Sequence, residues 1–172
     1  AQFRIRNFTV LSIPRLRLPE PGLKRATGFL IPSLRSTSDL GTGIKIPYFI
    51  KLGDHRDITL TPYLSSRTTT LELRYRQAFV NGDIDFEGAV SRDEIRTGET
   101  RAYVFGSGEF DLARDFKLTF SLELTSDDDY LEDYSFSFKD RLESSVTISR
   151  AKRDEYISGS VINYKSLRED ED

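Results

Sequence analysis

Hydrophobic and polar residues alternate along most of the chain between residues 27 and 166. The longest regular stretch is 116–125, where Phe116, Leu118, Phe120, Leu122 and Leu124 are separated by polar residues. Residues 69–80 and 82–92 show the same two-residue period. This period places apolar side chains on one face of a β-strand, whereas a helix repeats about every 3.6 residues. The pattern therefore predicts a chain that is nearly all strand.

Turn residues divide the alternating region into nine predicted strands. Their expected ranges are 27–36, 41–52, 56–66, 69–80, 82–92, 99–111, 114–126, 133–149 and 153–166. Between two of them, Asn81-Gly82 predicts a type I′ hairpin because both residues tolerate positive φ. Strands joined by such short turns pair with their sequence neighbours. The predicted fold class is therefore all-β, an antiparallel meander of about nine long strands.

The predicted strands are long, at roughly 10 to 13 residues for most of them. Strands of globular sheets average about 5–6 residues, whereas a strand that crosses a bilayer at a tilt needs about 9–11. One face carries Leu, Ile, Val and Phe and the other carries charged residues, as expected for lipid outside and a wet lumen inside. These features favour a portion of a large outer-membrane β-barrel. The alternative is a soluble, self-contained antiparallel barrel or sandwich that binds a lipid or a protein.

Overall charge and composition exclude several classes of function. Lys and Arg total 25 against 28 Asp and Glu, a net charge of -3, which argues against a nucleic-acid partner. The chain has no Cys, so thiolate metal sites and Cys nucleophiles are absent from it. No apolar run approaches the roughly 18–20 residues of a membrane-spanning helix. Membrane-spanning β-strands are compatible with that observation, because their apolar residues alternate with polar ones and form no long apolar run.

Candidate catalytic and metal-binding residues have simpler structural interpretations. Asp83, Asp85 and Glu87 alternate with apolar residues and are expected to face a lumen, and residues 127–129 are expected in an exposed loop. The single histidine, His55, follows Gly53-Asp54 and is interpreted as a turn residue. Neither EF-hand spacing nor a base near a candidate nucleophile is found. We therefore predict no catalytic residue, no metal and no cofactor.

Three ordered sequence blocks carry a family resemblance. They are Gly28-Phe29-Leu30-Ile31-Pro32, Ile46-Pro47-Tyr48-Phe49 and Asp57-Ile58-Thr59-Leu60-Thr61-Pro62. With them, the chain resembles the LptD (organic solvent tolerance) family of lipopolysaccharide-assembly proteins, particularly its alphaproteobacterial branch. Members of that family have a periplasmic β-jelly-roll followed by a barrel of some two dozen strands. The resemblance implies that residues 1–25 end the jelly-roll or form a linker, 26–166 are the first barrel strands, and 167–172 are an acidic tail or loop.

The resemblance also implies a role for Pro32 and Pro47. A proline within a strand cannot donate to the hydrogen-bond ladder. In the family, the prolines at matching positions lie in the first two barrel strands, beside the junction that is thought to part sideways. We hypothesise that Pro32 and Pro47 weaken this lateral gate so that lipid A leaves through the wall while the sugar chain passes through the lumen. The alternative is that they only end strands, as we expect of Pro62.

The family assignment implies a transport component and not an enzyme. Its expected partners are lipopolysaccharide, an LptE-like plug lipoprotein and the periplasmic Lpt bridge proteins, with the chain in the outer membrane and its N-terminal segment facing the periplasm. Within that basic segment, Arg15 and Arg17 either contact lipopolysaccharide phosphates or belong to a solvated linker. An isolated fragment would have two open strand edges, which are expected to drive self-association.

Overall fold

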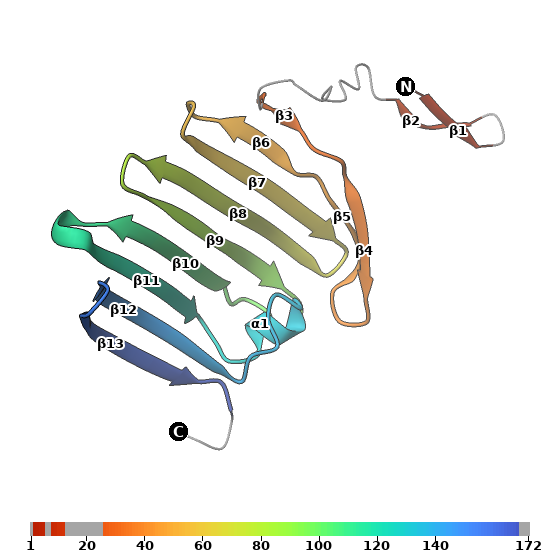
Figure 1. Cartoon of the computed structure of the whole chain (residues 1–172). Helices are drawn as coiled ribbons and strands as arrows, with labels where there is room; N and C mark the ends of the chain where they lie inside the picture. The colour runs from red at the N-terminus through yellow and green to blue at the C-terminus, as the bar shows by residue number, and fades with distance from the viewer. Residues whose placement is uncertain (1, 6–7, 13–25, 169–172) are drawn as a thin grey trace.

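The computed structural model describes residues 2–5, 8–12 and 26–168 (Figure 1). Near the N-terminus, β1 (Gln2–Ile5) pairs antiparallel with β2 (Phe8–Ser12) in a two-stranded sheet. The remaining strands form one antiparallel sheet of 11 strands. No helix in the described part of the chain is long and apolar enough to cross a membrane.

The large sheet begins with four short strands and continues with seven long ones. The short strands are β3 (Gly28–Phe29), β4 (Ser33–Thr37), β5 (Gly41–Lys45) and β6 (Tyr48–Lys51). The long strands are β7 (Arg56–Ser65), β8 (Thr68–Phe79), β9 (Gly82–Asp93), β10 (Arg101–Asp111), β11 (Phe116–Thr125), β12 (Arg141–Ala151) and β13 (Tyr156–Ser166). From β7 to β13 each strand pairs with its sequence neighbour. The predicted antiparallel meander is confirmed, and the sheet is open, with β13 at one edge and both β4 and β3 at the other.

The first two predicted strands are each divided in two. The range 27–36 contains β3 and β4, and the range 41–52 contains β5 and β6. Pro32 lies between the first pair of strands and Pro47 between the second pair. Nine predicted strands therefore become eleven, because each proline interrupts the strand in which it was placed.

The predicted strand 133–149 is wrong over residues 133–140, about half of its length. Residues 130–133 form the short helix α1 (Tyr130–Asp133), and β12 begins only at Arg141. The alternation of Tyr134, Phe136 and Phe138 imitates a strand. Instead, the rings of Tyr130, Tyr134 and Phe136 pack on one another, with the planes of Tyr134 and Phe136 only 6° apart. Tertiary packing of aromatic rings thus overrides the local pattern.

A tight hairpin forms near Asn81-Gly82 as predicted, but its turn is not type I′ and is shifted by one residue. Phe79 pairs directly with Gly82, so the turn residues are Val80 and Asn81, and neither has positive φ. Gly82 serves a different purpose, because a Cβ there would lie 2.1 Å from the carbonyl oxygen of Glu109. The paired positive φ values occur instead at Arg114 and Asp115, in the turn between β10 and β11.

The strand register gives the long sheet two distinct faces. Along β11, Phe116, Leu118, Phe120, Leu122 and Leu124 share one face with Val104 of β10 and Ile148 of β12. We call this the apolar face; large side chains on it are exposed, including Leu71, Val90, Val104, Leu124 and Ile148 at 42–50%. The opposite, polar face carries Glu72, Arg74, Asp85, Glu87, Ser107 and Glu123. The buried cluster lies on this polar face, where the segment that contains α1 packs against the sheet (Figure 1).

Candidate functional site

The two predicted gate prolines lie in neighbouring strand interruptions at one edge of the sheet. Between Phe29–Tyr48 and Ser33–Lys45, the two pairs that flank the break, residues 30–32 face only residues 46–47. Three residues opposite two make a β-bulge, which leaves the extra residue unpaired and bends the strand. Pro32 is exposed and Pro47 is half-buried. The structure therefore brings Pro32 and Pro47 together at a single break in the edge.

Few hydrogen bonds cross this break. The amide of Leu30 donates across it to the carbonyl oxygen of Pro47 at 2.9 Å. The amide of Ile46 donates in the other direction, to the carbonyl oxygen of Pro62 in β7 at 3.1 Å. Pro62 itself lies inside β7, where it pairs with Leu71, so its prediction as a strand-end residue is wrong. A proline contributes no amide donor to the ladder. Three prolines in consecutive segments thus reduce the number of possible ladder bonds across the first part of the sheet.

A second part of the site is the segment of residues 126–140, which connects β11 to β12 and contains α1. We call it the strap, because it folds back over the polar face. The hydroxyl of its Tyr130 lies 2.6 Å from the hydroxyl of Ser91, and the hydroxyl of its Tyr134 donates to Asp93 at 2.9 Å. Both tyrosines are fully buried, and burial raises the pKa of each phenol above its ordinary value.

The strap is held to the sheet by Arg101, which is 1% exposed. Two parallel hydrogen bonds, of 2.6 and 3.0 Å, join its guanidinium to Asp127. The same guanidinium forms ion pairs with Asp133 at 2.8 Å and with Asp93 at 3.6 Å. A bidentate arginine–carboxylate pair is strong and geometrically specific, so Arg101 fixes both the start of the strap and the end of α1.

The carboxyl group of Asp127 has a pKa below its ordinary value. Burial alone would raise that pKa, but hydrogen bonds from Arg101 and Ser126 and the positive charges of Arg101 and Arg96 outweigh burial. Asp127 was expected in an exposed loop, and its side chain is only 13% exposed. The spacing of Tyr130 and Tyr134, four residues apart, is the one sequence signal that could have revealed α1.

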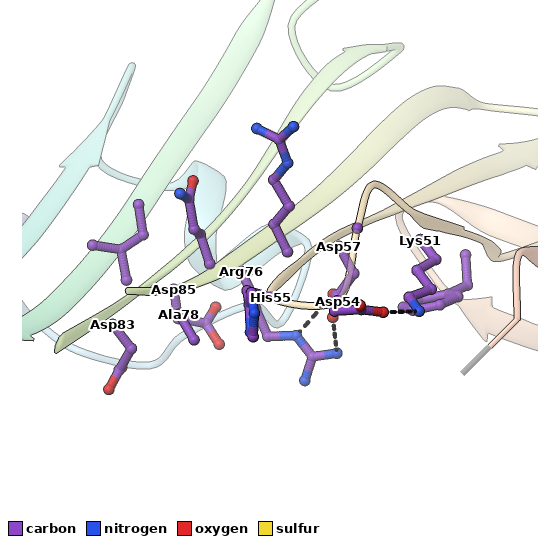
Figure 2. Close-up of a pocket in the computed structure, with 13 residues that line it drawn as sticks. Lys51, Asp54, His55, Asp57, Arg76, Ala78, Asp83 and Asp85 are labelled. Carbon is purple, nitrogen blue, oxygen red and sulfur yellow. Dashed lines mark hydrogen bonds and ion pairs between the residues drawn. The ribbon is translucent and has the colours of Figure 1, made fainter. Parts of the chain in front are cut away.

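A recess of about 560 Å³ opens on the polar face, at the end of the sheet with the shorter turns. Figure 2 shows its charged lining, in which Arg76 donates to Asp57 and Lys51 donates to Asp54. His55 lies in the bend between β6 and β7, as predicted. Within the described ranges, no group of three or more His, Cys, Asp or Glu residues is arranged to hold a metal ion. Two ion pairs, Lys51–Asp54 and Arg76–Asp57, lie within this lining, whereas Asp85 pairs with Arg74 outside it.

The other predicted contact residues, Arg15 and Arg17, lie outside the described residues. Sequence reasoning also missed Arg35 and Arg101. Arg35 lies on β4, and its guanidinium donates to the backbone carbonyl oxygen of Tyr134 at 2.5 Å. Charged residues on a predicted polar face are common, so nothing in the sequence distinguishes these two from their neighbours.

Comparison with known proteins places these features in a family context. The family model described as "LptD: LPS transport system D" matches residues 99–172. LPS-assembly protein LptD of Nitrosococcus oceani is 32% identical over 152 residues, which cover 80% of this chain and 19% of that protein. LptD of Shewanella sp. (strain ANA-3) is 28% identical over 182 residues, which cover 99% of this chain and 23% of the relative.

LptD of Idiomarina loihiensis is similar at 28% identity over 149 residues, which cover 84% of this chain and 19% of that protein. The chain thus spans about one-fifth of the length of the curated relatives it matches. The recognition of the LptD family from sequence is confirmed. The blocks that carried it, between residues 28 and 62, lie outside the match to the family model but within the alignment to the Shewanella relative.

Proposed function

We propose that this chain, a segment of LptD-family sequence, is part of the wall of an outer-membrane β-barrel that transports lipopolysaccharide into the outer leaflet. The observation that carries the proposal is the open apolar face, which extends over strands of 10 to 12 residues. A soluble sandwich would bury that face against a second sheet. In a barrel the same face contacts lipid, and the charged face lines the lumen. The soluble lipid- or protein-binding module is therefore less well supported.

The lengths of the connections support an orientation. At one end of the sheet the turns after β6, β8, β10 and β12 all have two to four residues. The opposite end has short turns at 38–40 and 66–67, and it also carries the two longest connections after β3, residues 94–100 and the strap. Outer-membrane barrels have short periplasmic turns and longer extracellular loops. The strap then lies at the extracellular end, and β3 begins at the periplasmic end. The N-terminal segment accordingly faces the periplasm, in agreement with residues 1–25 as the end of a periplasmic domain.

Within this wall, the break at Pro32 and Pro47 acts as one side of a lateral gate. The bulge and the missing amide donors lower the number of hydrogen bonds that must separate when the edge opens. The lipid part of lipopolysaccharide passes through this opening, and the sugar chain follows the polar face. A transport role of this kind needs no catalytic residue.

The proposed partners follow from the family. Lipopolysaccharide arrives from periplasmic Lpt bridge proteins, and an LptE-like plug lipoprotein occupies the lumen beside the polar face. Arg15 and Arg17 are proposed to contact lipopolysaccharide phosphates as the molecule enters, because guanidinium groups bind phosphate by charge and paired hydrogen bonds.

The test is the Pro32→Ala, Pro47→Ala double variant of the full-length protein, assayed for arrival of new lipopolysaccharide at the cell surface. Restored amide donors should tighten the edge and slow export. Ser33→Ala is the matched control, because it changes an exposed side chain beside Pro32 and leaves the backbone donors unchanged. Export by the double variant at the rate of the control would refute the gate.

A further inference from the structure

The break divides the sheet edge into two independent halves. The hairpin of β4 and β5, residues 33–45, forms one half, which we call the flap, and the pair of β3 and β6 forms the other. Each half is attached to the continuous strand β7, the flap by three residue pairs and β6 by four. Because both halves are attached to β7 separately, one half can separate from β7 while the other stays paired.

Of these two halves of the edge, the flap is the one that contacts the strap among the described residues. Arg35 donates to the carbonyl oxygen of Tyr134, and the ammonium nitrogen of Lys45 lies 5.9 Å from the ring centroid of Phe136. At the tip of the flap, Leu40 is fully buried in the same cluster as Tyr134. A hydrogen bond, a cation–π contact and apolar burial thus join these two segments, which lie about a hundred residues apart in sequence.

The half formed by β3 and β6 makes contacts of a different kind. Phe29 and Tyr48 pack edge to face on each other, and the amide of Lys51 donates a hydrogen bond to the hydroxyl oxygen of Thr27. Among the described residues, the hydrogen bonds and ring contacts of this half involve one another, β7 and the adjoining turn. The strap therefore has a connection to one half of the edge and not to the other.

At its far end, the strap is anchored to the interior of the sheet. Arg101 of β10 binds Asp127 and Asp133, and Ser91 of β9 bonds to Tyr130. Lys165 of β13 adds an ion pair with Asp128 at 3.0 Å. The strap thus links strands that form the continuous part of the wall to the flap at its broken edge.

We propose that the strap holds the flap closed, with Arg35 as the residue that couples them and Arg101 as the residue that fixes the strap. Arg35 and Arg101 are positioning residues for the gate. Release of the strap from Arg101 would free the flap, whereas loss of Arg35 would free the flap and leave the strap in place. The coupling between the strap and the flap does not depend on the proposed function. The role of flap opening in lipopolysaccharide export does rest on it.

The flap is also held by contacts outside the strap. The Ser65 hydroxyl donates to the carbonyl oxygen of Leu40, and Arg67 donates to that of Ser38 at 2.7 Å. Loss of the strap contacts should therefore increase local opening of the flap without unfolding the sheet. Couplings of this kind typically change an equilibrium about five- to 150-fold.

The experiment is amide hydrogen exchange, followed by peptide, on the full-length protein in detergent micelles. In Arg35→Gln we expect exchange over residues 33–45 to accelerate about fivefold or more, with the strap and residues 28–29 and 48–51 unchanged. Arg35→Lys should largely restore protection, since an ammonium group can still donate to the Tyr134 carbonyl. In Arg101→Gln, both the strap and the flap should exchange faster.

Arg92→Gln is the matched control, because Arg92 is the next-to-last residue of β9 and its guanidinium donates at 3.2 Å to Thr100, which belongs to neither the flap nor the strap. The proposal is overturned if Arg101→Gln accelerates exchange in the strap alone, or if Arg35→Gln leaves the flap as protected as in Arg92→Gln. If Arg101→Gln fails to fold, the comparison of Arg35→Gln with Arg35→Lys tests the proposal on its own. Exchange is measured without lipopolysaccharide, so failure of the export test would leave this result unaffected.

Discussion

The edge and the interior of the sheet share one alternating pattern and yet differ in continuity. At the edge, β3 to β6 have two to five residues each, whereas β7 to β13 have 10 to 12. Both regions present Leu and Ile on the apolar face, so hydrophobicity does not separate them. The difference lies in the backbone, where prolines and a bulge interrupt the first two strands. A wall can thus be uniform in its contact with lipid and still contain one weak place.

A proline introduced into an interior strand should have the largest effect, because the interior strands lack the breaks of the edge strands. Thr119 in β11 pairs with Glu109 on one side and with Thr147 on the other. Thr119→Pro removes an amide donor from the ladder. A backbone group left without its hydrogen-bond partner in a lipid environment should lower the free energy of unfolding by several kcal/mol. We expect loss of folded protein from the outer membrane, measured by its heat-modifiable migration in detergent gels.

Thr119→Ala is the control for this substitution, since it removes the side chain and keeps the amide donor. Assembly of Thr119→Pro at the level of Thr119→Ala would show that the interior tolerates breaks as the edge does. The contrast between the two regions would then have no energetic basis.

A charge placed on the apolar face should have a smaller effect that depends on position. Val104 pairs with Gly88 in the middle of β9, whereas Leu34 pairs through Ile44 with Leu64, near the end of β7 that adjoins the strap. If lipid covers this face, Val104→Arg should destabilise the protein by about 2–4 kcal/mol and Leu34→Arg by about 0–1 kcal/mol. Denaturant unfolding in lipid vesicles measures both. Equal values near zero would favour a face in contact with water.

Acid should weaken the strap only at low pH. The pKa of Asp127 is lowered in the folded protein, so its contribution is fully present above the unfolded value near 3.8 and is lost as pH falls through the lower folded value. Thermal stability should therefore fall more between pH 5 and about pH 2 in the wild type than in Asp127→Asn. The pKa values of Asp54 and Asp140 are also lowered, and their effect is common to both proteins. Parallel pH curves for the two proteins would count against the Asp127 contacts.

Much of the sheet could be predicted from sequence because alternation determines both the strand and its faces. Residues 116–125 were placed correctly, and their apolar side chains do share one face. The two prolines were placed inside the first two strands, and each lies instead in a break between two shorter strands at this edge. Strands joined by short turns must pair with their sequence neighbours, so the turns were sufficient to predict the antiparallel meander.

The strap could not be predicted because its structure depends on distant residues. Tyr134 and Phe136 alternate like strand residues, and only the cluster of rings and the Arg101 guanidinium hold them outside the sheet. Sequence carries no signal that pairs Arg35 with a carbonyl group a hundred positions away. The Asn81-Gly82 turn failed for a related reason, since close packing against Glu109 decides where Gly82 is needed.

The most direct test of the proposed gate is to find where new lipopolysaccharide first meets the wall. A photoreactive residue replaces Leu34 at the edge or Leu71 in the interior of the full-length protein; both side chains are exposed on the apolar face. After a pulse of labelled lipopolysaccharide, crosslinks should form at Leu34 earlier and in greater amount than at Leu71. Crosslinks that appear at both positions at the same time and to the same extent would contradict export through the broken edge.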